Sequence, residues 1–473
     1  MTFYLVLAFI YYIGTTAGLY GIFKKAGLPR PWVAFIPVVN LYYLLRIMGK
    51  SMAWFILLAL PFFNIITLII LLVDLAKCMG KDSLGWQLFV SFFPFIALPI
   101  LGFRKDITYL GTYQEASKKL PRKSSLKETV ELVVFTLLVA WGLRTFLIEP
   151  FNIPTGSMER TLRVGDFLFV SKIHYGTRIP ITPLSFPLAH NTLPILDIKS
   201  YIEKPSLPYM RLPALETIDV GDIIVFNYPM QDERPVDKRD HYIKRCLATP
   251  GDTLQIINTR TYINGKEYPL PATAQVRYLI RTDGTFSYQR ALRDLGIRPE
   301  DFMPTPDGNV LVLTTTSTAQ QFRRMPGVLE VEQVIDSAGR WDPNVFPHDS
   351  QYRWNIDNYG PIYMPRRGDT LPLNSLTYPL YKRLIEVYEK AGKLTIEGDQ
   401  VFLNGRPVTF YVTRMGYYFG MGDNRHNSLD SRFWGFIPED HMVGKPLMVW
   451  FSWEKNPPHK GPRWNRIFRW IRN

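Results

Sequence analysis

The chain has 473 residues, enough for two or three folded units, and a formal net charge of +14. Residues 1–150 contribute +8 of this charge (15 Lys and Arg against 7 Asp and Glu) and residues 455–473 contribute +6, so residues 151–454 are neutral. A basic excess beside apolar segments suits an anionic membrane surface. It argues against a nucleic-acid-binding protein, whose folded domain should itself be basic. Two cysteines exclude a disulfide scaffold.

Four apolar runs are long enough to cross about 30 Å of hydrocarbon as helices; they lie at residues 2–23, 53–73, 84–103 and 128–148. A fifth run at 31–48 is shorter and is interrupted by Pro37 and Asn40, so we expect a re-entrant or interfacial segment. The first run lacks the features of a removable signal peptide and should remain as a span. The sequence therefore predicts a membrane region at 1–110 (three spans plus the fifth segment), a basic linker at 111–127 and a span at 128–148.

The charges of the loops predict the orientation of these spans. Lys and Arg are concentrated in the loops 24–50 and 104–127, whereas in the loop 74–83 two lysines are offset by two aspartates. Because loops rich in Lys and Arg stay in the cytoplasm, the N-terminus and everything after Pro150 should lie outside. The linker at 111–127 should then be cytoplasmic.

From residue 151 onward, short β-type runs alternate with turn residues, which predicts a mainly β domain. The stretches "YINGKEY" (262–268) and "VFLNGRPV" (401–408) each place Asn-Gly between apolar residues, a strong signal for a hairpin. We expect the β domain to comprise residues 149–269 and 394–454. The residues between them, 270–393, are rich in Pro, Arg and Asp and contain one helical pattern at 380–392, so we interpret them as an inserted cap.

The end of the chain, 455–473, is a basic tail with an amphipathic pattern. In "RWNRIFRWIR" (463–472), apolar residues recur at helical spacing and arginines occupy the other side. This pattern is typical of a helix lying on a membrane surface, with aromatic anchors. The alternative is a helix packed on the surface of its own domain.

Two residues are candidates for a catalytic role. Ser157 lies in "FNIPTGSMERTL" (151–162), a Pro/Gly-containing loop directly after the last expected span, and a nucleophilic serine needs a base nearby. Lys244 lies in the apolar strand "YIKRCLATPGD" (242–252), where alternation should point it and Arg245 to opposite faces. If Lys244 faces the interior, desolvation lowers its pKa towards that of a useful base. The alternative is a lysine whose amine reaches the surface.

A third stretch, "GDNRHNSLDSRFWGFIP" (422–438), completes a pattern with these two and with "GDIIVF" (221–226). Together the four motifs resemble, in order and in position after a membrane span, those of the type I signal peptidases. This family comprises membrane-bound Ser/Lys endopeptidases that remove secretory signal peptides. The resemblance covers blocks within 150–254 and 415–453. It implies a signal-peptidase-like β fold behind a multi-span helical membrane region, in a chain with more spans than the family usually has.

The resemblance also implies roles for particular residues. Ser157 would be the nucleophile, Lys244 the general base in acylation and deacylation, and Thr155 a hydroxyl donor to the oxyanion. Ser428 would hold the lysine amine in place, while Asp423, Asp430 and Arg432 would brace the site through an ion pair. From their spacing, Ser428, Asp430 and Arg432 are expected to share one face of a short extended segment. Pockets for the small side chains of an Ala-x-Ala end would be lined by Ile153, Met158, Leu162 and Ile243.

The same resemblance implies exported preproteins as substrates, with contact to the lipid bilayer and to the secretion machinery. It requires no metal or other cofactor and no nucleic acid. The location would be the bacterial inner membrane, with several spans and the catalytic domain on the periplasmic side. A self-cleaving repressor with a similar dyad would need a DNA-binding segment, and the apolar N-terminal third argues against one. A non-catalytic membrane adaptor would have no reason to keep Ser157, Lys244, Ser428 and Asp430 together.

Overall fold

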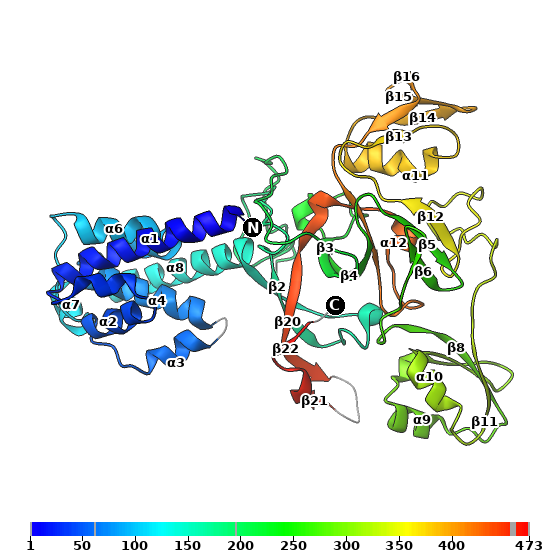
Figure 1. Cartoon of the computed structure of the whole chain (residues 1–473), viewed down its shortest axis with the longest axis horizontal. Helices are drawn as coiled ribbons and strands as arrows, with labels where there is room; N and C mark the ends of the chain where they lie inside the picture. Colours follow the sequence, from blue (N-terminus) through cyan, green and yellow to red (C-terminus); the bar gives the residue numbers. More distant parts are fainter. Residues whose placement is uncertain (1, 61–62, 194–195, 455–459, 472–473) are drawn as a thin grey trace. The chain divides into compact units, whose positions relative to one another are not determined.

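The computed structural model describes residues 2–60, 63–193, 196–454 and 460–471. The chain divides into two compact units, residues 1–143 and 144–473, and each is described by itself. The first unit is helical and the second is mainly β (Figure 1). The predicted order of a helical region followed by a mainly β domain is confirmed.

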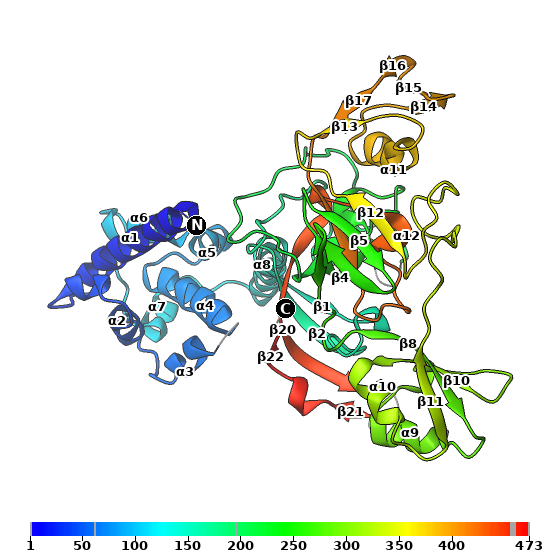
Figure 2. The same cartoon turned by 45° about the vertical axis from the view of Figure 1, so that its right-hand side comes forward.

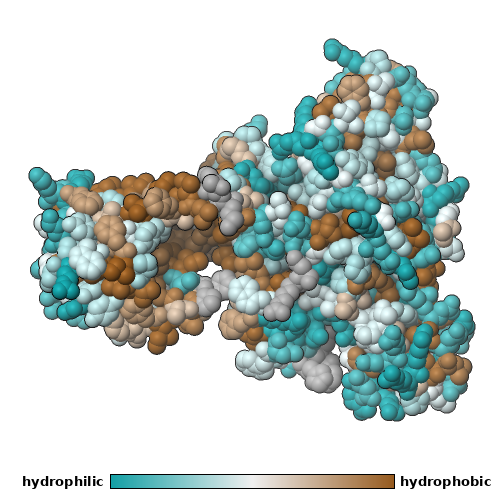
Figure 3. Space-filling view, in the orientation of Figure 1, coloured by the Kyte–Doolittle hydropathy of each residue, from teal (hydrophilic) through white to brown (hydrophobic). Residues whose placement is uncertain are grey.

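The first unit consists of helices of unequal length. They are α1 (Thr2–Lys25), η1 (Pro31–Phe35), α2 (Val39–Ile47), α3 (Trp54–Ala59), α4 (Phe63–Cys78), α5 (Leu84–Phe92), α6 (Pro94–Phe103), α7 (Tyr113–Lys119) and α8 (Ser125–Phe146), the last turn of which belongs to the second unit. Helix α1 packs against α6 through glycines, since a Cβ at Gly18 would lie 2.4 Å from the backbone of Leu98. Small residues allow such close helix contacts in membranes. Elsewhere α1 exposes apolar side chains such as Phe9 and Ile10. Hydrophobic residues cover much of the visible surface of the helical unit (Figure 3).

Within the described residues, two of the four expected spans are single helices of sufficient length. Among the described residues, α1 and α8 are long and apolar enough to cross a membrane, and α5 with α6 would make a third candidate if this pair, bent by 119°, were one span. The run at 53–73 is divided between α3 and α4. Leu60 is extended there and is followed in sequence by Pro61, which disfavours helical backbone in the residue before it. The 31–48 segment forms η1 and α2, and its depth in a membrane stays a prediction.

The expected linker at 111–127 also contains regular structure. It comprises α7 and the first residues of α8. A capping box starts α7, in which Thr112 caps the helix and the Glu115 side chain accepts a hydrogen bond from the Thr112 backbone N–H at 2.8 Å. The first turns of α8 are held by Lys123, which lies 2.8 Å from Asp82 and 2.7 Å from Glu131.

The main sheet of the second unit carries the chemistry. Its strands run in the order β1-β2-β20-β3-β4-β18-β19, and all neighbours are antiparallel. The strands are β1 (Ile148–Asn152), β2 (Asp166–Ser171), β3 (Ile223–Asn227), β4 (His241–Ala248), β18 (Tyr417–Met421), β19 (Ile437–Pro438) and β20 (Met442–Glu454). The short helices η3 (Val236–Lys238) and η6 (Glu439–His441) precede β4 and β20. Strand β20, near the end of the chain, therefore lies between β2 and β3, which come from the early part of the second unit.

Both predicted Asn-Gly hairpins are confirmed. The first lies in the sheet β12-β5-β6-β7, with β5 (Thr253–Ile257), β6 (Arg260–Ile263), β7 (Lys266–Tyr268) and β12 (Tyr359–Tyr363); the second lies in β14 (Leu394–Glu397), β15 (Gln400–Leu403) and β16 (Arg406–Val408). Asn264 and Gly265 have φ of 52° and 77°, and Asn404 and Gly405 have 53° and 75°. These positive values are what a type I′ turn requires, which explains the choice of Asn-Gly.

The segment 270–393 contains two different kinds of structure. Its first part is a lobe with its own apolar core, built from the sheet β11-β8-β10-β9 and two helices (Figure 2). Its elements are β8 (Gln275–Thr282), α9 (Tyr288–Leu295), η4 (Pro299–Asp301), β9 (Phe302–Pro304), β10 (Val310–Thr315), α10 (Thr316–Phe322) and β11 (Val328–Gln333). The later part joins its neighbours, since β12 pairs with β5, β13 (Thr370–Pro372) pairs with β17 (Phe410–Val412), and α11 (Tyr378–Arg383) and η5 (Leu384–Tyr388) share a core with Leu254 and Phe419.

The predicted helix in the tail is wrong over its described part, 463–471. The chain there forms β21 (Gly461–Pro462), η7 (Trp464–Arg466) and β22 (Arg469–Trp470), and both short strands pair with β20. The Arg466 guanidinium forms an ion pair of 2.5 Å with Asp166, which is fully buried. A buried carboxylate needs such a partner, and β20 offers backbone groups for pairing, so these contacts replace a surface helix.

Candidate active site

Ser157 is held in a short turn that the first two strands position. Helix η2 (Gly156–Met158) carries it, and the preceding Ile153 N–H donates to the Asp166 carbonyl at 2.9 Å. From the other side, the Asn424 backbone N–H donates to the Ser157 carbonyl at 3.0 Å. The Ser157 side chain is mostly buried, with 9% of the residue exposed. Its hydroxyl is therefore fixed at the edge of the interior rather than in a mobile loop.

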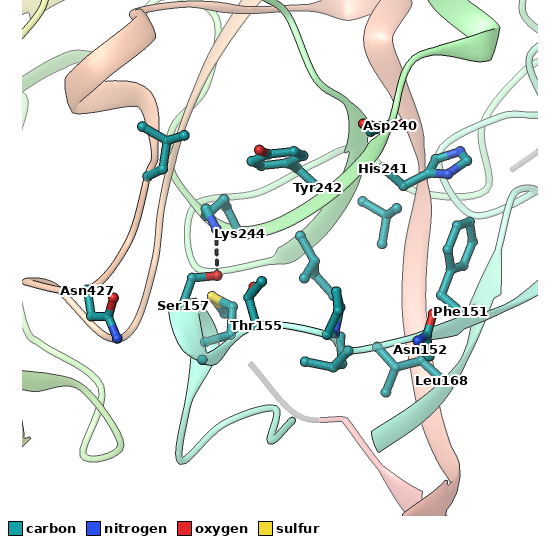
Figure 4. Close-up of a pocket in the computed structure, with 17 residues that line it drawn as sticks. Phe151, Asn152, Thr155, Ser157, Leu168, Asp240, His241, Tyr242, Lys244 and Asn427 are labelled. Atoms are coloured by element: carbon teal, nitrogen blue, oxygen red, sulfur yellow. Dashed lines mark hydrogen bonds between the residues drawn. The ribbon is translucent and has the colours of Figure 1, made fainter. Parts of the chain in front are cut away.

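Lys244 meets this hydroxyl from the middle of β4. Its Nζ lies 2.7 Å from Ser157 Oγ and donates a hydrogen bond to it (Figure 4). Lys244 is 2% exposed, and burial lowers the pKa of its amine from 10.5 to about 8, while the nearby Asp430 carboxylate acts in the opposite direction. Desolvation disfavours the charged form of an amine, so the burial that this strand imposes makes Lys244 a base that is partly neutral near pH 7.

Arg245, the neighbour of Lys244, is also buried, and it forms an ion pair with Asp423 on the opposite face of β4. Its Nε and Nη2 lie 2.9 and 2.7 Å from the two oxygens of Asp423, and the Thr161 hydroxyl donates to the same carboxylate at 2.5 Å. The sequence predicts that Asp423 belongs to an ion pair but does not identify Arg245 as its partner. The pair links β4 to the segment after β18 and to the loop that carries Ser157.

Asp430 and Arg432 form a second buried ion pair. The two oxygens of Asp430 each lie 2.9 Å from a nitrogen of the Arg432 guanidinium. Asp430 also accepts from the Gly422 backbone N–H at 3.0 Å and caps the short helix α12 (Ser431–Trp434). The expected extended segment is therefore wrong for Arg432, which lies inside this helix. An Asp at the N-cap and Gly435 just after the helix are sequence signals that could have predicted it.

Ser428 is buried close to the nucleophile turn, but its hydroxyl has no hydrogen-bond partner among the described residues. The expected hydrogen bond to the Lys244 amine is not made in this structure. A Cβ built on Gly422 would lie 2.2 Å from Ser428 Oγ and 2.5 Å from the Ser157 carbonyl. Gly422 thus permits the close approach of these two serines, and a larger residue would separate them.

A cavity of about 520 Å³ opens at the Ser157–Lys244 pair and extends along β4 to Asp240 and His241 (Figure 4). Thr155, Ile153, Met158 and Ile243 are among the residues that line it. Leu162, also expected to line a pocket, is instead packed in the apolar cluster with Ile153 and Met158 and is 1% exposed. The lining also includes Phe151, Leu168, Tyr242 and Val225, which sequence reasoning did not identify because they come from four separate elements.

The geometry suits acyl transfer. A hydroxyl and a desolvated amine lie within hydrogen-bond distance, at the end of a cavity with apolar walls. The Thr155 side chain and the Ser157 backbone belong to the same turn, so donors for a developing oxyanion are available beside the hydroxyl. The arrangement therefore combines the groups that acyl transfer needs, a hydroxyl beside a desolvated amine with an adjoining cavity.

Comparison with protein families gives two matches. The family described as "Signal peptidase, peptidase S26" matches residues 126–339 and 402–453, together more than half of the chain. These blocks contain Ser157, Lys244 and the whole of 422–438. A family of unknown function, DUF5684, matches residues 32–112 in the helical unit.

Individual relatives are similar over most of the chain. Signal peptidase I of Buchnera aphidicola (subspecies Acyrthosiphon pisum) is 28% identical over 366 residues, which cover 77% of this chain and 88% of the relative. Signal peptidase I of Haemophilus influenzae is 28% identical over 363 residues, 76% of this chain and 80% of the relative. That of Pseudomonas aeruginosa is 26% identical over 362 residues, 74% of this chain and 81% of the relative.

Proposed function

The chain belongs to the signal peptidase family, peptidase S26, and on that premise we propose that it is a membrane-bound endopeptidase using a Ser/Lys dyad. Its substrates are exported preproteins, from which it removes the signal peptide. Ser157 is the nucleophile and Lys244 the general base. The observation that carries this proposal is the 2.7 Å contact between Lys244 Nζ and Ser157 Oγ at a buried position.

The reaction proceeds through an acyl-enzyme. The neutral Lys244 amine takes the proton of the Ser157 hydroxyl as Oγ attacks the carbonyl before the cut, and the Ser157 backbone N–H and the Thr155 hydroxyl stabilise the oxyanion. The protonated amine then gives its proton to the nitrogen of the leaving chain. Water then attacks the ester carbonyl as Lys244 takes its proton. The protonated amine gives that proton to Ser157 Oγ as the bond between Oγ and the acyl carbon breaks, which restores Ser157 and neutral Lys244.

The two buried ion pairs support the dyad by fixing the segments that pack against Ser157 and Lys244. Asp430 lies near enough to Lys244 to influence its charge, and its contacts to Gly422 and Arg432 fix the segment that packs on Ser157. Asp423, held by Arg245, lies against the Thr161 hydroxyl in the same nucleophile loop. We assign both carboxylates to positioning, and Ser428 to orienting the amine once substrate has displaced the bond between Lys244 and Ser157.

Specificity for a small residue before the cut and two positions earlier, as in Ala-x-Ala, fits the cavity beside the dyad. An extended peptide lying along β4 directs alternate side chains towards the wall, so Ile153, Met158 and Ile243 limit their size. Leu162 acts from behind this wall, because it packs on Ile153 and Met158.

Location follows from the helices and the loop charges. The candidate span α8 ends at Phe146, eleven residues before Ser157, which keeps the active site near the bilayer. The basic loops at 24–50 and 104–127 support a location of the second unit on the periplasmic side of a bacterial inner membrane, behind a multi-pass N-terminal region. Contact with the secretion machinery is part of the same proposal.

The test is cleavage of a purified preprotein by the full chain in detergent and in proteoliposomes. Ser157→Ala and Lys244→Ala should each abolish cleavage at the signal-peptide junction, while Lys266→Ala, which changes a lysine on β7 away from the site, should retain it. Cleavage that persists in either dyad variant, with no other peptidase present, would disprove the assignment.

A further inference from the structure

The lobe built from residues 275–333 takes no part in the proposed chemistry, although it contacts the turn that carries Ser157. Its sheet and helices enclose an apolar core of their own, so it is a folded body and not a loose insertion (Figure 2). The residues that line the cavity beside the dyad, as far as the chain is described, all lie outside 275–333. Any effect of the lobe on the reaction is therefore exerted through the turn.

The first contact between the lobe and the turn is made where β8 begins. The Gln275 N–H donates to the Asp423 carbonyl, and the Arg425 N–H donates to the Gln275 carbonyl, both at 2.8 Å. Between these two bonds, the Asn424 N–H donates to the Ser157 carbonyl at 3.0 Å. The Asn424 side-chain amide donates to the carbonyl of the residue before Ser157 at 3.2 Å. The strand that opens the lobe is thus joined to the nucleophile turn through Asn424.

The second contact comes from the segment after α9. This helix is capped by Gly296, whose φ of 57° favours glycine and redirects the chain towards Arg298. The Arg298 guanidinium lies 2.8 Å from a carboxylate oxygen of Glu159, two residues after Ser157. The Arg160 guanidinium donates to the Gly296 carbonyl at 3.1 Å. Two consecutive residues just after the nucleophile turn are therefore bonded to the lobe.

The pair of Arg298 and Glu159 lies directly against the turn. A Cβ built on Gly156, the residue before the nucleophile, would lie 3.1 Å from Arg298 Nη1 and 3.8 Å from Glu159 Oε2. The side chains of the pair are 28% and 7% exposed, respectively. Fully exposed ion pairs hold their partners weakly, whereas a shielded, hydrogen-bonded pair fixes their geometry. We therefore treat this pair as a fixed point of the turn.

Several carboxylates depend on the Arg298 guanidinium. Besides Glu159, it pairs with Glu300, and Asp301 lies nearby with 2% exposure. Burial raises the pKa of Asp301 to about 6, Arg298 opposes this rise, and Glu159 adds to it. Without the guanidinium, Glu159 and Asp301 would remain as neighbouring buried carboxylates, which repel each other. Loss of Arg298 should therefore push the lobe away from the turn.

We propose that Arg298 is a positioning residue for the reaction, through which the lobe holds the Ser157 hydroxyl in reach of the Lys244 amine. The turn is attached at the Ser157 carbonyl by Asn424 and at Glu159 by Arg298, so the hydroxyl lies between two fixed points. A turn held at one point only would allow Oγ to leave its 2.7 Å contact with Nζ, and a misplacement of about 1 Å can cost about a hundredfold in rate. The inference rests on the proposed roles of Ser157 and Lys244.

Steady-state cleavage of a short peptide with an Ala-x-Ala end by the full chain in detergent tests the proposal. Arg298→Met should lower kcat by a factor of about ten or more and leave KM within about twofold, because Arg298 does not line the cavity. The unchanged KM also establishes that the variant is folded. Arg298→Lys keeps a cation for Glu159 and should recover part of the rate. Arg290→Met is the matched control, since it breaks an exposed pair with Asp294 on the same lobe and should keep the original kcat.

A double variant tests the charge reasoning. Glu159→Gln alone removes one side of the pair and should lower kcat several-fold. Added to Arg298→Met, it should restore part of the lost rate, because it removes the repulsion between Glu159 and Asp301. Losses that simply multiply in the double variant would show that the two residues act independently, which contradicts the proposal.

Hydrogen exchange, read by mass spectrometry, gives a measurement that does not depend on activity. In the full chain carrying Ser157→Ala, Arg298→Met should raise backbone exchange within residues 153–162 several-fold, and Arg290→Met should not. Unchanged exchange there would overturn the inference, as would an unchanged kcat in Arg298→Met or an equal loss in the Arg290 control. If Ser157→Ala alone still cleaves the peptide, the proposed function fails, and a positioning role in that reaction fails with it.

Discussion

The acid limb of the pH–rate profile should be set by the Lys244 amine. Only its neutral form accepts a proton, and burial brings its pKa from 10.5 to about 8. The neutral fraction is then about 9% at pH 7, about 50% at pH 8 and about 91% at pH 9, whereas an unshifted lysine would be neutral only to about 0.03% at pH 7. We therefore expect kcat/KM to rise about tenfold between pH 7 and pH 9 and to level off above that.

The assay is cleavage of a fluorogenic peptide with an Ala-x-Ala end by the full chain in detergent, read as kcat/KM because this constant reports the free enzyme. Asp430→Asn is the informative variant. The Asp430 carboxylate raises the pKa of Lys244, so its neutralisation should move the midpoint below 8. A profile that is flat from pH 7 to 9, or that keeps rising tenfold per unit beyond pH 9, would refute the role of a desolvated Lys244.

Four further substitutions probe the site. Lys244→Met should abolish cleavage yet remove a cost of about 3 kcal/mol that the depressed pKa of the amine imposes on folding below pH 8, a cost that fades between pH 8 and 10.5 as the amine loses its proton in the unfolded chain as well. Ser428→Ala should leave stability unchanged or raise it by up to about 1 kcal/mol, since its hydroxyl has no partner in the described part of the chain, and kcat should fall because that hydroxyl is assigned to orienting the amine. Arg245→Met strands the buried Asp423 carboxylate and should cost roughly 3–5 kcal/mol, read from thermal unfolding. Gly422→Ala should cost roughly 1–3 kcal/mol and most of the activity, because its Cβ would collide with the Ser428 hydroxyl.

Three of these variants, at Ser428, Arg245 and Gly422, have a matched control in the chain. Thr314→Val, on β10, removes another buried hydroxyl that has no partner among the described residues, and should leave kcat unchanged because Thr314 does not line the cavity. Arg281→Met breaks an exposed pair with Glu330 and should cost less than about 1 kcal/mol. Gly85→Ala adds a Cβ with no atom of the described residues within 4 Å and should be tolerated. If a control variant lost as much activity or stability as its counterpart, the losses in the site variants would not come from the local contacts of the substituted residues.

Ser157 and Lys244 could be predicted as a candidate pair because family motifs surround both, whereas local pattern alone left Lys244 open between a base and a surface lysine. Ser157 follows an apolar run in a turn-forming sequence, and Lys244 interrupts an otherwise apolar strand. Their 2.7 Å approach could not be derived from local pattern, since 87 positions separate them and only the sheet order brings β4 to the nucleophile turn. The same limit explains why Arg245 was not predicted as the ion-pair partner of Asp423. Alternation predicts one buried side chain, but the segment holding Asp423 covers the second face as well.

The errors have a common cause in tertiary contacts that override local pattern. The tail has helical periodicity, yet pairing with β20 and the ion pair between Arg466 and Asp166 produce short strands instead. In the helical unit, hydropathy identified apolar runs correctly but not the breaks within them, and the break before Pro61 was visible in the sequence. The Asn-Gly hairpins were predictable because the turn itself dictates the residues.

Strand β20 lies in the centre of the main sheet although it is among the last segments to be synthesised. Before β20 is synthesised, no strand connects the β1-β2 pair to the β3-β4 pair. The residues from Asp423 to Arg432, which pack on Ser157, are synthesised only shortly before β20. A nascent or prematurely terminated copy thus holds a serine and a lysine with nothing to bring them together. The centre of the sheet is thus completed by almost the last residues of the chain, and the order in space differs from the order of synthesis.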